Sequence, residues 1–160
     1  MIQAMSASSA TTTPEQAEQP FAWSDKYVLG YGPMDKVHEE FVDMVGQLLS
    51  APDSELPARM QAFMQHAKAH FELENSLMEE TEFPARGCHI DEHAAVMKSC
   101  EEVSQLLEQG NAAVCRDLAR ELAKWFPGHA DYLDSALSHW MCKRRMGGKP
   151  VVLRRDIELR

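Results

Sequence analysis

A chain of 160 residues with a formal net charge of −9 is expected to form one domain around a single core. The negative charge argues against nucleic acid or an anionic membrane as a partner of the folded body. No apolar run is long enough for a membrane span, and the N-terminus lacks the basic start and apolar segment of a secretory signal. The four cysteines form no CxxC pair, so we expect a reduced, cytoplasmic setting.

The two ends of the chain differ in composition from its middle. Residues 1–20 are mostly Ser, Thr, Ala, Pro, Gln and Glu, and we expect a disordered lead there. Residues 144–160 form a basic tail, which we expect to be solvated and to lie on the acidic body. The alternative is that this tail docks an acidic protein partner. Between them, residues 21–143 form the predicted domain, and it begins with an arm rich in aromatic residues: Phe21, Trp23, Tyr27 and Tyr31.

Four amphipathic helices are predicted, because apolar residues recur at steps of three or four positions. They cover about residues 34–49, 54–81, 88–109 and 112–142. Pro127, followed by glycine, lies inside the last helix and should kink or loosen one turn. Short loops between four such helices predict an all-α fold, an antiparallel up-down-up-down four-helix bundle.

Each predicted helix carries at least one histidine on its apolar face. Residues four apart share a face of a helix, so paired ligands on one helix can reach the same metal site. In an antiparallel bundle, the start of the first and third helices lies level with the end of the second and fourth. The metal-capable residues on these faces therefore converge on one layer of the core: His38, His70, Glu74, His89, His93 and His129.

Five histidines in one buried layer indicate bound metal. A single buried histidine is usually satisfied by a hydrogen bond, but five together with Glu74 would leave many polar groups unpaired. The set is too large for one tetrahedral zinc and suits two metal ions with bridging carboxylates. Mixed nitrogen and oxygen ligands favour iron, manganese or zinc over calcium or magnesium, and the spacing does not choose among these three.

The fourth helix offers two candidates for a second carboxylate ligand. Asp134 follows His129 by five residues, which places it about 140° away around an ideal helix. A one-residue π-bulge, or a loosened turn after Pro127, would bring the two side chains together. Asp131 competes for the same role, and spacing alone leaves the choice open.

Two further histidines, His66 and His139, lie off the apolar faces of their helices. A regular fourth helix would turn Ala136 inward, and a bulged one would turn Leu137 and Met141 inward, so His139 misses the face in either case. Polar residues off the apolar face usually meet solvent, and we expect neither histidine to be a ligand.

The combined motifs cover roughly residues 21–142. They are Trp23, Gly30, Met34-Asp35-x-x-His38, His70-Phe71-x-x-Glu74 with Met78, His89-x-x-x-His93, and Trp125-x-x-x-His129-x-x-x-x-Asp134. In this combination the chain resembles the bacterial hemerythrins, which are non-haem di-iron oxygen-binding proteins, and all seven ligand positions of that family are filled. The sequence departs from the family at Asn75, where a second glutamate is frequent, and at Val37, where a glutamine is frequent.

The resemblance implies a ligand assignment. One iron would be held by His89, His93 and His129, and the second by His38 and His70. Two carboxylates, Glu74 and Asp134, would bridge the irons together with an oxo or hydroxo group. Oxygen would bind at an open position on the second iron, in a dry pocket whose candidate walls are the aromatic residues beside the ligands: Phe41, Phe71, Trp125 and Phe126.

The function implied by the resemblance is reversible dioxygen binding for transport, storage or delivery, without catalysis. Di-iron bundles that activate oxygen use mostly glutamates with repeated Glu-x-x-His, and the ligand candidates here show no such repeat. The alternatives are a di-iron peroxidase or oxidase, a nitric-oxide-handling protein, and a module that senses oxygen or iron.

Overall fold

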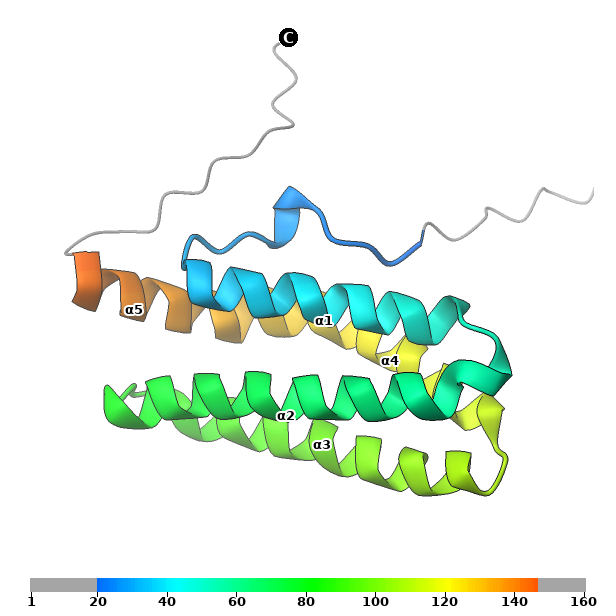
Figure 1. Ribbon diagram of the computed structural model, residues 1–160. Coiled ribbons are helices and arrows are strands. Elements are labelled where there is room, and N and C mark those ends of the chain that lie inside the picture. Colours follow the sequence, from blue (N-terminus) through cyan, green and yellow to red (C-terminus); the bar gives the residue numbers. More distant parts are fainter. Residues whose placement is uncertain (1–19, 147–160) are drawn as a thin grey trace, which may run out of the picture.

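The structure, a computed structural model, describes residues 20–146 and confirms the predicted all-α four-helix bundle (Figure 1). The N-terminal lead before Pro20 and the tail from residue 147 onward lie outside the described residues, so the expectations for them remain predictions. The elements are η1 (Asp25–Tyr27), α1 (Gly32–Ser50), η2 (Asp53–Glu55), α2 (Leu56–Glu80), α3 (Arg86–Glu108), α4 (Ala112–His129), η3 (Ala130–Asp134) and α5 (Ser135–Met146).

Local sequence signals set the ends of the helices. Proline in the first turn of α1 and of α2 is favourable, because that turn needs no amide donor. Asn111 caps the start of α4 by accepting a hydrogen bond from the amide of Val114 at 3.2 Å. Gly110 lies two residues after the end of α3 and has a φ of 91°, a backbone conformation that favours glycine. None of the described helices has the length and hydropathy that a membrane span requires.

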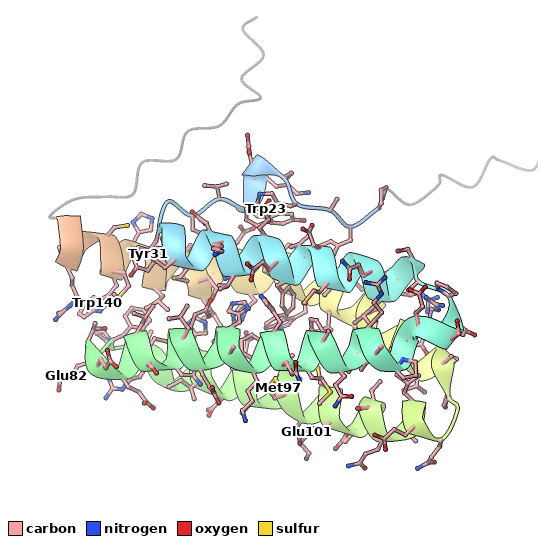
Figure 2. All side chains as sticks on the ribbon, viewed as in Figure 1. Trp23, Tyr31, Glu82, Met97, Glu101 and Trp140 are labelled. Atoms are coloured by element: carbon pink, nitrogen blue, oxygen red, sulfur yellow. The ribbon has the colours of Figure 1, made fainter. Side chains whose placement is uncertain are left out.

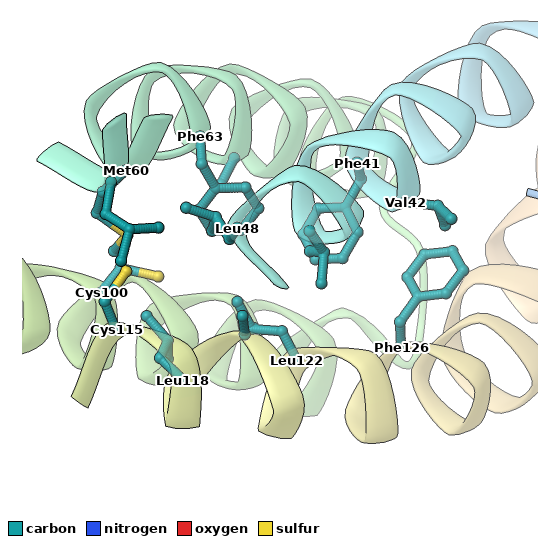
Figure 3. Packing of buried hydrophobic residues seen from close by; sticks show 14 of the residues in the cluster. Phe41, Val42, Leu48, Met60, Phe63, Cys100, Cys115, Leu118, Leu122 and Phe126 are labelled. Atoms are coloured by element: carbon teal, nitrogen blue, oxygen red, sulfur yellow. The ribbon is translucent and has the colours of Figure 1, made fainter. Parts of the chain in front are cut away.

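Two apolar clusters fill the bundle, one at each end of the long axis. The larger contains Phe41, Leu48, Phe63, Leu122 and Phe126 among its buried members, some of which Figure 3 shows. Side chains occupy the space between the helices along their whole length (Figure 2). The smaller cluster closes the other end and comprises Tyr31, Met34, Met78, Phe83, Leu137, Met141 and Cys142. Burial of these side chains, at about 25 cal/mol per Å² of apolar surface, is the main stabilising contribution to the fold.

The N-terminal arm packs along α1 (Figure 1). Asp35 in the first turn of α1 accepts hydrogen bonds from the amides of Leu29 at 2.7 Å and Gly30 at 3.0 Å. The ring of Tyr27 lies 5.3 Å from that of Phe126 in an edge-to-face contact. The arm therefore covers the outside of the core next to α4.

The fourth helix of the bundle is built from α4, η3 and α5 in succession. Pro127 does not end α4, which continues to His129 and then widens into a single π-helical turn, η3. The extra residue in that turn shifts the helix register, because a π turn closes between residues five apart. Leu137 and Met141 are consequently buried, at 0% and 3% exposure, while Ala136 is exposed. The bulged alternative is the one that the structure adopts.

We expect Leu137→Ala to lower the free energy of unfolding by about 2–5 kcal/mol, because it leaves a cavity in a packed cluster. The neighbouring Ala136→Ser, at an exposed position, should change it by no more than about 0.5 kcal/mol. Urea titration of the metal-free protein, followed by circular dichroism, measures both values. The opposite order of sensitivities would mean that the helix is regular past His129.

Candidate metal centre

The seven expected ligand residues meet in one layer between the two apolar clusters. Each is at least 95% buried. They come from every helix of the bundle: His38 from α1, His70 and Glu74 from α2, His89 and His93 from α3, His129 from the end of α4, and Asp134 from the end of η3.

The two carboxylate oxygens of Glu74 face two different pairs of histidines. Its Oε1 lies 3.0 Å from Nε2 of His38 and 2.8 Å from Nε2 of His70. Its Oε2 lies 3.2 Å from Nε2 of His93 and 3.5 Å from Nε2 of His89. This carboxylate therefore stands between a pair from α1 and α2 and a pair from α3.

Asp134 repeats this arrangement from the opposite side. Its Oδ2 lies 3.1 Å from Nε2 of His38, while its Oδ1 lies 2.9 Å from Nε2 of His89 and 3.1 Å from Nε2 of His129. Asp131, one turn earlier, is exposed. The π turn thus brings Asp134, and not Asp131, onto the face of the helix that carries His129.

Two histidine nitrogens face each other in a way that requires a positive charge between them. Nδ1 of His129 donates a hydrogen bond to Oε2 of Glu92 at 2.5 Å, and Nδ1 of His93 donates one to Oδ1 of Asn75 at 2.8 Å. A neutral imidazole has one N–H, so the Nε2 atom of each ring carries a lone pair. These Nε2 atoms are 3.2 Å apart. Two lone pairs at that distance repel unless a cation or a proton lies between them.

Unpaired polar atoms in the same layer support a cation site. Burying such atoms without a partner costs about 1–3 kcal/mol each, and more for charged groups. Imidazole nitrogen and carboxylate oxygen are donors that iron, manganese and zinc accept. The inward-facing buried atoms of this layer that lack a hydrogen bond are His89 Nε2, Glu74 Oε2 and both carboxylate oxygens of Asp134.

The ligand atoms fall into two groups that share one residue. Within each group the candidate atoms lie within 4.8 Å of one another, and Glu74 belongs to both. The groups are Glu74, His89, His93, His129 and Asp134, and His38, His70 and Glu74. A buried cluster of this composition fits a di-iron site.

In the metal-free layer, the two carboxylates raise the pKa of the two histidines that both of them contact. Burial lowers the pKa of His38, but its close contacts with the carboxylates of Asp134 and Glu74 outweigh burial and raise it to about 10. The same balance raises the pKa of His89 to about 9. Burial acts to raise the pKa of Glu74, yet the surrounding histidines hold it well below its usual range. Metal must therefore displace protons from His38 and His89, so binding strengthens as the pH rises.

Four aromatic side chains, the candidate walls of the oxygen pocket, adjoin the histidines. Rings stack between Phe71 and His93, with centroids 4.1 Å apart, and between Trp125 and His129, with centroids 4.2 Å apart. The ring of Phe126 meets His38 edge-on at 5.5 Å, and that of Phe41 meets His70 edge-on at 5.8 Å.

His66 and His139 lie outside both ligand groups. His139 is exposed on α5. His66 is partly buried, and its Nε2 lies 3.0 Å from Oε2 of Glu40. Burial lowers the pKa of His66.

Sequence reasoning missed the hydrogen-bond partners of the ligand histidines. Glu92 sits on the solvent side of α3, and Asn75 stood out only as a departure from the family pattern. Ligand histidines commonly donate their second N–H to a carboxylate, but the position of Glu92 next to His93 gave no signal, because Glu92 accepts from His129 on another helix.

Comparisons with known proteins agree with the geometry. The family model described as Hemerythrin HHE cation binding domain matches residues 29–138, a range that contains all seven site residues. A bacteriohemerythrin from Ralstonia nicotianae is 33% identical over 122 residues, which are 76% of this chain and 89% of the relative. A bacteriohemerythrin from Aquifex aeolicus is 33% identical over 108 residues, which are 64% of this chain and 82% of the relative. No solved structure gives a significant match. The chain therefore belongs to the hemerythrin HHE family.

Proposed function

We propose that this protein binds dioxygen reversibly at a non-haem di-iron centre, for oxygen transport, storage or delivery. One observation carries the proposal: Glu74 and Asp134 each present one oxygen to one histidine group and the other oxygen to the second group. Such a carboxylate pair is suited to bridging two cations. A ferrous pair held there would lend two electrons to dioxygen on binding and recover them on release.

The proposed ligands follow the two histidine groups. His89, His93 and His129 hold one iron, and His38 and His70 hold the other. Glu74 and Asp134 bridge them, together with an oxo or hydroxo group. Because the group of His38 and His70 has one histidine fewer, an iron held there would have room for dioxygen.

The walls of the centre favour binding over turnover. Phe41, Phe71, Trp125 and Phe126 surround the histidines on the side of the larger apolar cluster and form the proposed oxygen pocket. Apolar walls exclude the water and protons that would convert bound oxygen into reduced products. The chain's own residues thus hold the metals, orient the rings and keep the pocket dry.

Iron loading followed by absorption spectroscopy tests the function. The loaded protein should contain two irons per chain, and its spectrum should change on exposure to oxygen and return when oxygen is removed. One iron per chain would contradict the proposed centre. Turnover of peroxide, or a spectrum that does not return, would favour a di-iron peroxidase or oxidase.

Substitution of the two aspartates in η3 distinguishes the proposed bridging residue, Asp134, from its competitor, Asp131. Asp134→Ala should disrupt the di-iron spectrum and reduce the iron content, because a bridge serves both ions. Asp131→Ala, at an exposed position of the same π turn, should leave both unchanged. Elemental analysis and absorption spectra make the comparison, and iron loss in the Asp131 variant would reverse the assignment.

Phe71 lines a surface groove of about 290 Å³ between α2 and α3, which Asn75 and His93 also line. Phe71→Ala should admit more water to the histidines and speed conversion of the oxygenated protein to the ferric state. It should also cost about 3–5 kcal/mol of stability. Stopped-flow oxygenation, followed by the slow spectral decay, measures the conversion.

Phe63→Ala is the matched control for this variant. Phe63 is a fully buried phenylalanine of the same apolar cluster, but its ring packs against that of Phe41, with centroids 5.4 Å apart, and not against a ligand histidine. Its truncation should destabilise the protein similarly and leave the decay rate near that of the parent. Equal decay rates in the parent and the Phe71 variant would show that Phe71 serves only the core.

A further inference from the structure

The five proposed ligand histidines differ in the hydrogen-bond partner of Nδ1, the ring nitrogen that points away from the two bridging carboxylates. Nδ1 of His129 donates to the carboxylate of Glu92 at 2.5 Å, whereas Nδ1 of His93 donates to the neutral amide of Asn75 at 2.8 Å. The Nδ1 atoms of His38, His70 and His89 have no hydrogen-bond partner. Among the five, only His129 is thus joined through its Nδ1 atom to a negatively charged side chain.

The bond from His129 to Glu92 has the properties of a strong anchor. Hydrogen bonds to a carboxylate are shorter and about twice as strong as bonds between neutral groups. Because a carboxylate can only accept, the bond fixes the proton on Nδ1 and leaves Nε2 free to bind metal. The indole of Trp125 stacks on the face of the same ring, with centroids 4.2 Å apart. The hydrogen bond and the stacking together fix the orientation of the His129 imidazole.

The backbone around His129 explains why such an anchor is useful. Pro127 lies two residues earlier and has no N–H, so α4 loses one of its hydrogen bonds there. The π turn η3 begins one residue after His129. His129 therefore stands between two departures from regular helix, and Glu92 ties it to α3, which is regular throughout.

Glu92 also connects the buried histidine with the surface. Its side chain is 45% exposed, while that of His129 is 2% exposed. It lines two neighbouring surface grooves, of about 400 Å³ and 360 Å³, that both include Trp125, and the second of them also reaches His129. A charge at this position is in water on one side and in contact with a metal ligand on the other.

We propose that Glu92 is a positioning residue of the metal centre, which acts through His129. It orients the imidazole for metal binding, and its negative charge makes the ligand more basic and favours the ferric over the ferrous state of the iron. A carboxylate partner of a ligand histidine acts in this way in metal sites generally. The redox half of this inference rests on the proposed di-iron function, whereas the orienting half holds for any divalent metal in the site.

Three variants separate orientation from charge. Glu92→Gln keeps a hydrogen-bond acceptor and removes the charge, and Glu92→Ala removes both. Asp91→Asn removes one negative charge from the neighbouring exposed position of α3 and serves as the matched control. Circular dichroism verifies that each variant folds.

Two measurements read out the two roles. Titration of the metal-free proteins with Co²⁺ should show a tenfold to hundredfold loss of affinity in Glu92→Ala and at most a severalfold loss in Glu92→Gln. Spectroelectrochemical titration of the iron-loaded proteins should show a higher midpoint potential in Glu92→Gln than in the parent. Asp91→Asn should match the parent in both measurements.

Two results would overturn the proposal. The first is an unchanged Co²⁺ affinity in Glu92→Ala. The second is a midpoint potential in Glu92→Gln equal to that of the parent or of Asp91→Asn. Failure of the proposed function itself would be distinguishable, because it would appear in the parent as absent or irreversible oxygen binding. The Co²⁺ titration involves neither iron nor oxygen and tests Glu92 regardless.

Discussion

Two carboxylates buried among five imidazoles are the constraint on which this structure depends. Glu74 and Asp134 lie in the interior of the bundle, where an unneutralised charge is very unfavourable. Protons on His38 and His89 offset them in the metal-free chain, and two divalent ions would offset them in the loaded one. Every helix contributes to this layer, so the arrangement of the bundle and the binding of metal cannot be separated.

This layer divides the hydrophobic core and lowers what the core can contribute to stability. At a typical core position a histidine replaces an apolar side chain worth about 1.5–3 kcal/mol when fully buried. The apolar clusters on either side make up for this loss, and they also keep water from the polar layer. The polar layer thus lowers the stability of the bundle, and the apolar clusters on its two sides restore it.

Most of the fold, and the convergence of the candidate ligands on one layer, could be predicted from the sequence, because both depend on helical spacing. Met34, His38 and Phe41 recur at the period of a helix face, and all are buried as that period requires. The choice of Asp134 over Asp131 could not be made from spacing, because it depends on a π turn that only the packing of the whole fourth helix reveals. Glu92 was missed for another reason: it is only half-buried, and its role comes from a neighbour on a different helix.

The π turn also sets the rotation of α5, because the orientation of every later side chain depends on the number of residues in the turn. The extra residue that aligns Asp134 rotates everything after it by about 100° relative to a regular helix. That rotation lets Ser138 donate to the carbonyl of Leu29 in the arm at 3.2 Å, and lets Trp140 donate to Thr81 at the end of α2 at 2.8 Å. A one-residue deletion in η3 would therefore turn Asp134 away from the histidines and break both of these hydrogen bonds. The number of residues in this turn thus sets both the position of Asp134 and the packing of α5 against the arm and α2.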